Sequence, residues 1–296
     1  MQNRLSKPKV KLSEIAKVMA GQSSADPVLV VNSIEGPTIR CELRCLAAHR
    51  EVSSPVANYE SFMLIIEGKG KGTLKESNRP EKDYGLGKDD FLFAPFGSSC
   101  CLANDQSQPL LYVLVRGVLL NGAPVDERSR ELYGPAYVTQ DGSQTLRLIK
   151  AGEREIYRHG HRTHGHEAAP ASIGTSVQRG VQYPNCGSRT VAAARSRLEP
   201  TRPKVPHWQN FDEVRYIISG ELIDHQGPKE SEEEVIQAEA GDFIYIPSRV
   251  RHYQTSSKGC ESACLWGITL ATWCPDMEDG KFGNYHPSSF IYREGD

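Results

Sequence analysis

The chain has 296 residues, with 35 lysines and arginines against 37 aspartates and glutamates, so its formal net charge is -2. A chain this close to neutral has no overall field to attract nucleic acid or an anionic membrane surface, so we expect neither as a partner. No apolar run reaches the ~18 residues of a membrane helix, the first residues lack the apolar core of a secretory signal, and the eight cysteines form no CxxC pair, which together predict a cytoplasmic protein.

Short strand-like runs dominate the chain from one end to the other. They are rich in aliphatic and aromatic residues, and Gly, Pro, Asn and Asp turn signals separate them. In chain order the runs cover residues 29–34, 39–46, 62–68, 89–95, 110–115, 190–198, 214–220, 241–247 and 263–271. Few long stretches show a helical period, so we predict an all-β protein of sandwiches or barrels with few short helices.

The chain also contains an internal repeat. NYESFMLIIEG at 58–68 matches NFDEVRYIISG at 210–220, and the same offset of 152 positions aligns DFLFAP at 90–95 with DFIYIP at 242–247. Only two copies exist and each is longer than 100 residues, which indicates a duplicated domain rather than a solenoid. The length suffices for two domains of about 100 to 150 residues, so we predict two tandem β-barrels.

The repeat divides the chain into four parts: an N-terminal arm at 1–22, a first barrel at 23–150, a linker at 151–188 and a second barrel at 189–296. We expect the linker to cross the surface as a loop. It contains four closely spaced histidines, His159, His161, His164 and His166. Because no carboxylate or cysteine accompanies them at a fixed ligand spacing, we predict a solvated or subunit-contact loop rather than a metal site.

A polar cluster lies at the entrance of one predicted strand of the second barrel. His207, Gln209 and Glu213 come at the start of this strand, and His252 follows the segment GDFIYIP. At the offset of 152 the first barrel has no counterpart of the two histidines and the glutamate, and instead contains Pro55, Ser61 and Cys100. Shared architecture therefore does not require these side chains, which favours a metal site in the second barrel. The alternative is a hydrogen-bonded polar cluster in a binding barrel that holds no metal.

The alternation of side chains along a strand directs Glu213 and Arg215 to one face, which is the interior if the barrel closes. Arg215 has two possible roles. Its planar guanidinium suits a substrate carboxylate, and it equally suits a salt bridge with Glu213 or Asp212. For Gln209 we weigh a supporting position behind a metal ligand against a weak fourth ligand.

These motifs resemble those of the cupin superfamily in its tandem form. The first cupin motif is matched by residues 207–220, in which Gln209 stands where the general pattern has its second histidine. The second motif is matched by residues 241–252. The resemblance implies two tandem cupin barrels, with a first barrel that lacks ligands and a second that binds a metal through His207, Glu213 and His252.

Within the cupins, this ligand set resembles that of ring-cleaving dioxygenases of the homogentisate, 3-hydroxyanthranilate and hydroquinone types. It implies an Fe(II)-dependent dioxygenase whose two histidines and one glutamate leave positions open for a small aromatic substrate and O2. Gln209 and Arg215 are then the expected catalytic residues beside the ion.

The alternatives concern the metal and the reaction. The same ligands suit Mn, Ni or Zn. The reaction alternatives are another metal-dependent cupin reaction, either isomerisation or decarboxylation, and a non-catalytic pair of barrels that binds a small molecule. We also expect a homo-oligomer, in which residues 1–22 are an exchanged arm.

Overall fold

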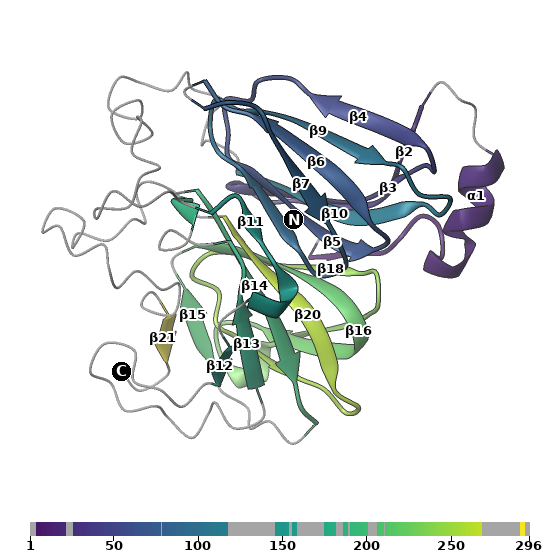
Figure 1. The fold of residues 1–296 in the computed structure, drawn as a ribbon. Helices are drawn as coiled ribbons and strands as arrows, with labels where there is room; N and C mark the ends of the chain where they lie inside the picture. The colour runs from purple at the N-terminus through teal and green to yellow at the C-terminus, as the bar shows by residue number, and fades with distance from the viewer. Residues whose placement is uncertain are drawn as a thin grey trace, which may run out of the picture.

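Two β-barrels lie against each other in the computed structural model, the first in purple to blue and the second in teal to yellow (Figure 1). The structure describes residues 4–21, 26–77, 79–117, 146–153, 156–158, 175–181, 186–188, 190–200, 206–209, 211–267 and 291–293. The four linker histidines between 159 and 166 lie outside these residues. Within the described part of the chain, no helix is long and apolar enough to cross a membrane. The described residues contain one α-helix, the seven-residue α1 (Ile15–Gly21).

The first barrel consists of two sheets packed face to face. Its strands are β2 (Val28–Glu35), β3 (Ile39–Leu46), β4 (Arg50–Ser54), β5 (Ser61–Glu67), β6 (Gly70–Lys75), β7 (Lys82–Leu86), β8 (Phe91–Ala94), β9 (Ser99–Asn104) and β10 (Leu110–Gly117). One sheet has the order β11-β8-β5-β10-β3-β2, where β11 is Leu148–Ile149, and the other has the order β4-β9-β6-β7. All strand pairs in both sheets are antiparallel.

The second barrel repeats this arrangement around one long strand. Its strands are β12 (Ile156–Arg158), β13 (Thr175–Arg179), β14 (Val191–Leu198), β15 (His207–Gln209), β16 (Asp212–Gln226), β17 (Glu234–Glu239), β18 (Phe243–Ile246), β19 (His252–Thr255), β20 (Cys260–Gly267) and β21 (Ile291–Arg293). The first half of β16 pairs with β18 and β20, and its second half pairs with β17 and β19. A register shift between Ile217 and Ser219 marks the change, as a β-bulge does where a strand bends from one sheet to another.

The linker extends the sheet of the second barrel rather than only crossing its surface. Strand β12 pairs with β13, and β13 pairs with β14 over five residue positions. The sequences IYR and TSVQR are too short to show a clear alternation, and this is why the chain pattern did not predict them as strands.

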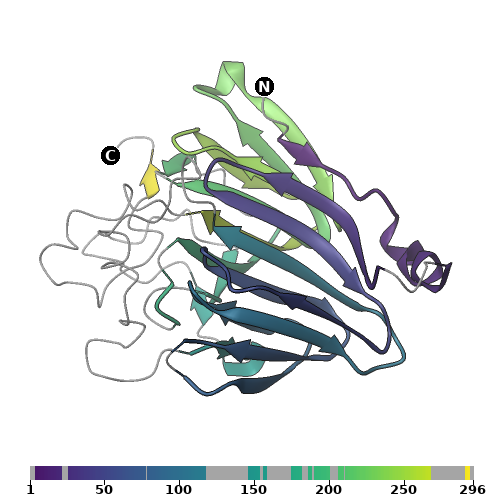
Figure 2. The same ribbon diagram turned by 90° about the horizontal axis from the view of Figure 1, so that it is seen from above.

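The two barrels exchange short strands. Strand β1 (Leu5–Ser6), from the arm before the first barrel, pairs with β18 of the second, through Leu5 opposite Ile244. Conversely β11, which precedes the second barrel, pairs with β8 of the first, through Leu148 opposite Leu92. The purple N-terminal strand lies beside the light-green strands in Figure 2. The N-terminal arm is therefore exchanged within the chain, between its own two halves.

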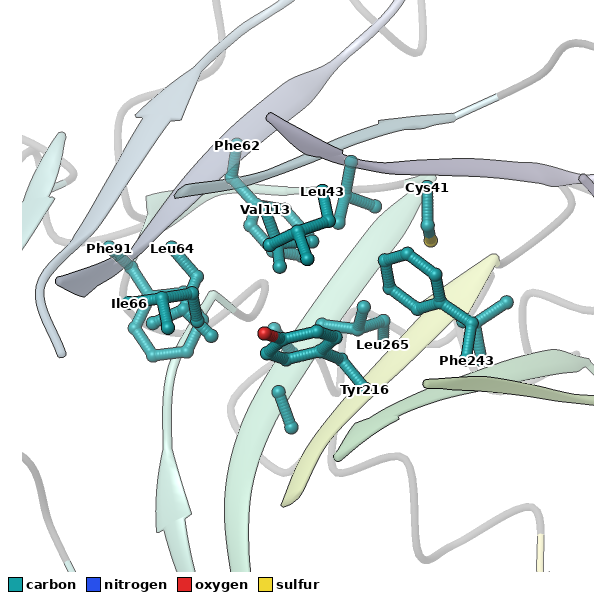
Figure 3. Packing of buried hydrophobic residues seen from close by; sticks show 14 of the residues in the cluster. Cys41, Leu43, Phe62, Leu64, Ile66, Phe91, Val113, Tyr216, Phe243 and Leu265 are labelled. Carbon is teal, nitrogen blue, oxygen red and sulfur yellow. The ribbon is translucent and has the colours of Figure 1, made fainter. Parts of the chain in front are cut away.

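A shared hydrophobic core joins the barrels. One face of the β5 sheet and one face of the β16 sheet meet there, and both contribute fully buried side chains. Figure 3 shows Tyr216, Phe243 and Leu265 of the second barrel facing Leu43 and Val113 of the first. Because Val214 and Tyr216 face this core, the intervening residues of β16 face the interior of the second barrel, as the alternation predicts.

Two buried carboxylates tie the barrels together in equivalent ways. Asp212 accepts hydrogen bonds from the backbone N–H of Thr38 at 3.1 Å and its hydroxyl at 2.6 Å. Glu60 accepts hydrogen bonds from the backbone N–H of Thr190 at 2.7 Å and its hydroxyl at 2.9 Å. Both pairs are related by the offset of 152, since 212 minus 60 and 190 minus 38 are both 152. Each barrel thus gives one carboxylate and one threonine to the other.

Close packing beside these threonines makes Gly267 sensitive to substitution. A Cβ at Gly267 would lie 2.5 Å from the hydroxyl oxygen of Thr38 and 2.7 Å from the Cβ of Ile39. We expect Gly267→Ala to lower the free energy of unfolding by about 1 to 3 kcal/mol, because the added methyl group overpacks the junction. Urea denaturation measures this, with Gly152→Ala as the control, since nothing lies within 4 Å of a Cβ there. An equal effect of the two substitutions would contradict the prediction.

Candidate functional site

The interiors of the two barrels differ in chemistry although their strands correspond. The first interior is a closed cluster of apolar side chains, including Met63, Leu74, Leu102 and Tyr112. At the offset of 152 the second barrel replaces several of these with polar side chains: Met63 by Arg215, Leu74 by Gln226, Cys100 by His252 and Leu102 by Gln254. The correspondence is structural, because Gly72 pairs with Leu102 as Asp224 pairs with Gln254. A polar interior is therefore specific to the second barrel.

The fold brings two of the predicted ligands together. His207 on β15 lies directly opposite His252 on β19, and the centroids of their imidazole rings are 4.3 Å apart. Both side chains are buried, with exposed fractions of 8% and 0%. Two histidines separated by 45 positions in the sequence (252 minus 207) thus meet inside one barrel.

The tautomer of His252 suits a metal ligand. Its Nδ1 lies 2.9 Å from the backbone oxygen of Val250, and since a carbonyl only accepts, Nδ1 carries the proton. In the neutral imidazole, Nε2 then presents its lone pair. This atom is buried and has no hydrogen-bond partner among the described residues. A hydrogen bond that fixes the tautomer from behind is the usual support of a histidine that ligates a metal.

Glu213 contacts Arg215 on the same strand. Its Oε1 lies 2.7 Å from Nε of Arg215, and the exposed fractions of the two residues are 2% and 8%. Burial disfavours the charge on Arg215, but the neighbouring Cys264, Glu213 and Asp224 favour it and leave the pKa of the guanidinium above its usual range. Of the two roles considered for Arg215, the structure shows the salt bridge with Glu213.

Within the described residues, no three His, Cys, Asp or Glu side chains are arranged to hold a metal ion. The structure thus brings His207 and His252 together and leaves Glu213 with Arg215, and the three-ligand set stays a prediction. A carboxylate has several lone pairs on its two oxygens, so contact with an arginine does not use all of its acceptor capacity. For Gln209, the structure describes the backbone of β15 and not the side chain.

The composition of the interior suits a cation. Glu213 and Asp224 contribute two buried carboxyl groups to the interior that also holds the guanidinium of Arg215. Buried carboxyl groups, together with an imidazole nitrogen that has no hydrogen-bond partner among the described residues, are chemically matched to a divalent ion with nitrogen and oxygen ligands. The two facing imidazoles, in an interior that also contains buried carboxylates, therefore fit such a group.

The chain pattern did not reveal three further interior residues, Asp224, Gln226 and Gln254. All three are at most 1% exposed, and both glutamine side chains donate hydrogen bonds to Asp224. Burial raises the pKa of the Asp224 carboxyl, while His252, the two amides and Arg215 oppose the shift. Polar residues in a strand usually indicate its exposed face. The repeat contained the signal, because Gly72, Leu74 and Leu102 stand at these positions in the first barrel.

Comparisons with solved structures identify the architecture. Oxalate decarboxylase of Lactobacillus farciminis in its formate complex superposes with a TM-score of 0.60 at 12% identity, over 91% of this chain and 96% of that one. A variant of Bacillus subtilis oxalate decarboxylase gives a TM-score of 0.59 at 13% identity, over 92% and 90%. No protein-family model matches the sequence, and no curated protein matches it. The tandem cupin fold, with both barrels present, is thus confirmed.

Proposed function

We propose that the protein is a metal-dependent enzyme whose second barrel decarboxylates a small carboxylic acid. The observation that carries the proposal is the meeting of His207 and His252 inside that barrel, with the lone pair of His252 Nε2 buried and without a partner in the described chain. Arg215 adds a buried positive charge on the wall of the same interior. The similar solved structures, which are oxalate decarboxylases, support this choice of reaction among the cupin alternatives.

In this proposal His207, His252 and Glu213 hold the ion. Bound there, the metal supplies a Lewis acid that accepts negative charge from the reacting acid. Iron(II) and manganese both suit nitrogen and oxygen ligands, and nickel and zinc remain alternatives. Gln209 is expected to support a metal ligand from behind or to act as a weak fourth ligand.

Arg215 binds the substrate carboxylate in this proposal. Its guanidinium presents several N–H groups in one plane, a geometry that suits a carboxylate. The carboxyl group leaves as CO2, the electron pair of the broken carbon–carbon bond stays on the remaining carbon, and that carbon takes up one proton. Burial excludes bulk water from this step and strengthens the electrostatic interactions.

The ring-opening dioxygenase implied by the sequence resemblance finds less support. The interior side chains of β16 and β19 include charged groups and amides beside the apolar Ile217 and Leu222, whereas an aromatic ring is held mainly by apolar and aromatic walls. The two reactions also differ in a measurable way, because ring opening consumes O2 and decarboxylation does not.

Purification without oxygen, followed by elemental analysis and assays of CO2 release and O2 uptake, tests the proposal. The panel contains oxalate, malonate and lactate together with homogentisate and gentisate. We expect about one metal ion per chain and CO2 release from a small acid without O2 consumption. O2 uptake with an aromatic acid would instead establish the dioxygenase, and a metal-free protein without turnover would indicate a binding protein.

A further inference from the structure

A buried cluster of one carboxylate and two amides lies in the second barrel beside the histidines. We call Asp224, Gln226 and Gln254 the amide cluster. Nε2 of Gln226 donates to Oδ2 of Asp224 at 2.6 Å, and Nε2 of Gln254 donates to Oδ1 at 2.8 Å. Both oxygens of one carboxylate thus bind amide N–H groups, on side chains that are at most 1% exposed.

These hydrogen bonds fix the orientation of both amides. Nε2 of Gln226 also lies 3.0 Å from the backbone oxygen of Tyr245, so this nitrogen faces two acceptors. Rotating the Gln226 amide by half a turn would place its oxygen against both acceptor oxygens. The same rotation in Gln254 would place Oε1 against Oδ1 of Asp224, so that two oxygens would face each other without a hydrogen bond. Asp224 therefore acts as a positioning residue that turns both amide oxygens away from itself.

Among the described residues, the two amide oxygens have no hydrogen-bond donor. Oε1 of Gln226 and Oε1 of Gln254 are buried, and neither has a hydrogen-bond partner among the described residues. Gln226 lies opposite His252 in the antiparallel pairing of β16 and β19, and Gln254 lies opposite Asp224. The register thus gathers the two amide oxygens and His252 Nε2 on one interior wall.

Buried acceptors are normally paired, so this wall requires hydrogen-bond donors that the described chain does not provide. The first barrel shows that the fold itself does not need the cluster, because it has Gly72, Leu74 and Leu102 at these positions. A polar wall that the architecture does not require, and that leaves acceptors unused, has the properties of a recognition site for a ligand with O–H groups.

We propose that the amide oxygens of Gln226 and Gln254 accept hydrogen bonds from hydroxyl groups of the substrate, which makes the substrate class a small hydroxylated carboxylic acid. This inference rests on the proposed function for the placement of the carboxylate at Arg215. The hydroxyl groups donate hydrogen bonds to the two glutamine oxygens of the amide cluster, while Asp224 keeps both oxygens pointing toward the substrate. An acid without hydroxyl groups leaves these acceptors unpaired and binds more weakly.

Titration calorimetry with matched pairs of acids, lactate against propionate and malate against succinate, tests the inference on the metal-loaded protein. We expect the wild type to bind the hydroxylated member of at least one pair more than about tenfold tighter, because unpaired buried acceptors discriminate against the analogue. Gln226→Leu and Gln254→Leu install the residues of the first barrel and should bring this ratio close to one. Gln237→Leu, at an exposed position of β17, is the control and should keep the wild-type ratio.

Equal affinity for both members of each pair in the wild type overturns the inference, and so does failure to bind any of the four acids. These two results need no variant, so they stand even if a leucine variant does not fold. Preservation of the ratio in both folded leucine variants also overturns it, as does loss of the metal from Gln254→Leu, which would make the amide a metal ligand. Metal content and CO2 release, measured on the same wild-type preparation, report separately on the proposed function.

Discussion

Replacement of His252 by leucine is expected to abolish metal binding and, with it, CO2 release. The side chain of His252 is fully buried, and its Nδ1 donates a hydrogen bond to the backbone oxygen of Val250. Its Nε2 is buried and has no hydrogen-bond partner among the described residues, so this nitrogen is the atom available to a metal ion. Substitution of residues that merely support a metal ligand lowers affinity by about 10- to 100-fold, so loss of the ligand itself should exceed this range. Anaerobic titration with Fe(II) or Mn(II), followed by elemental analysis, measures the effect.

His225 is the matched control for this experiment. It lies on the neighbouring strand β16, at a position of opposite parity to Asp224 and Gln226, and its ring stacks on Tyr253 with centroids 4.3 Å apart. His225→Leu should therefore leave the metal content at the wild-type value. If His252→Leu retains the full metal content, the assignment of the ion to this histidine is wrong.

Asp212→Ala is expected to destabilise the protein strongly, because this buried carboxylate joins the two barrels. Besides Thr38, its carboxylate accepts hydrogen bonds from the hydroxyl of Tyr245 at 2.9 Å and the backbone N–H of Ser248 at 3.1 Å. Alanine leaves these buried donors without an acceptor, and we expect the free energy of unfolding to fall by about 3 to 5 kcal/mol. Urea denaturation followed by circular dichroism measures the difference.

The control for Asp212 is another hydrogen-bonded aspartate in an exposed place. Asp83 accepts from Thr73 and Lys71 on the outer sheet of the first barrel, where water replaces lost partners. Asp83→Ala should therefore leave the unfolding midpoint nearly unchanged. A similar shift for both variants would show that the junction between the barrels does not depend on Asp212.

Much of the architecture could be predicted from the sequence because its signals are local. Strand alternation and turn residues predict the barrels, and the repeat at a constant offset predicts that there are two. The same alternation places Glu213 and Arg215 in the interior of the second barrel. The meeting of His207 with His252 follows from motif spacing, and the structure brings these two side chains together.

Other features depend on contacts that leave no pattern in the chain. Strands β1 and β11 have two residues each, too few for any periodicity, so their exchange between barrels is visible only in the structure. The pairing of Glu213 with Arg215 was one of two alternatives, and which one forms depends on side-chain packing. The amide cluster consists of polar residues in strands, and only a comparison of the two halves distinguishes such residues from an exposed face.

The reciprocal contacts of Asp212 with Thr38 and of Glu60 with Thr190 have a consequence for the ancestry of the molecule. Each half presents both an acceptor and its matching donor on one surface, which is the self-complementary arrangement of a twofold homodimer. Covalent fusion of two such subunits preserves the interface while freeing their cavities from identical selection. One half is then able to specialise as a scaffold and the other to retain chemistry.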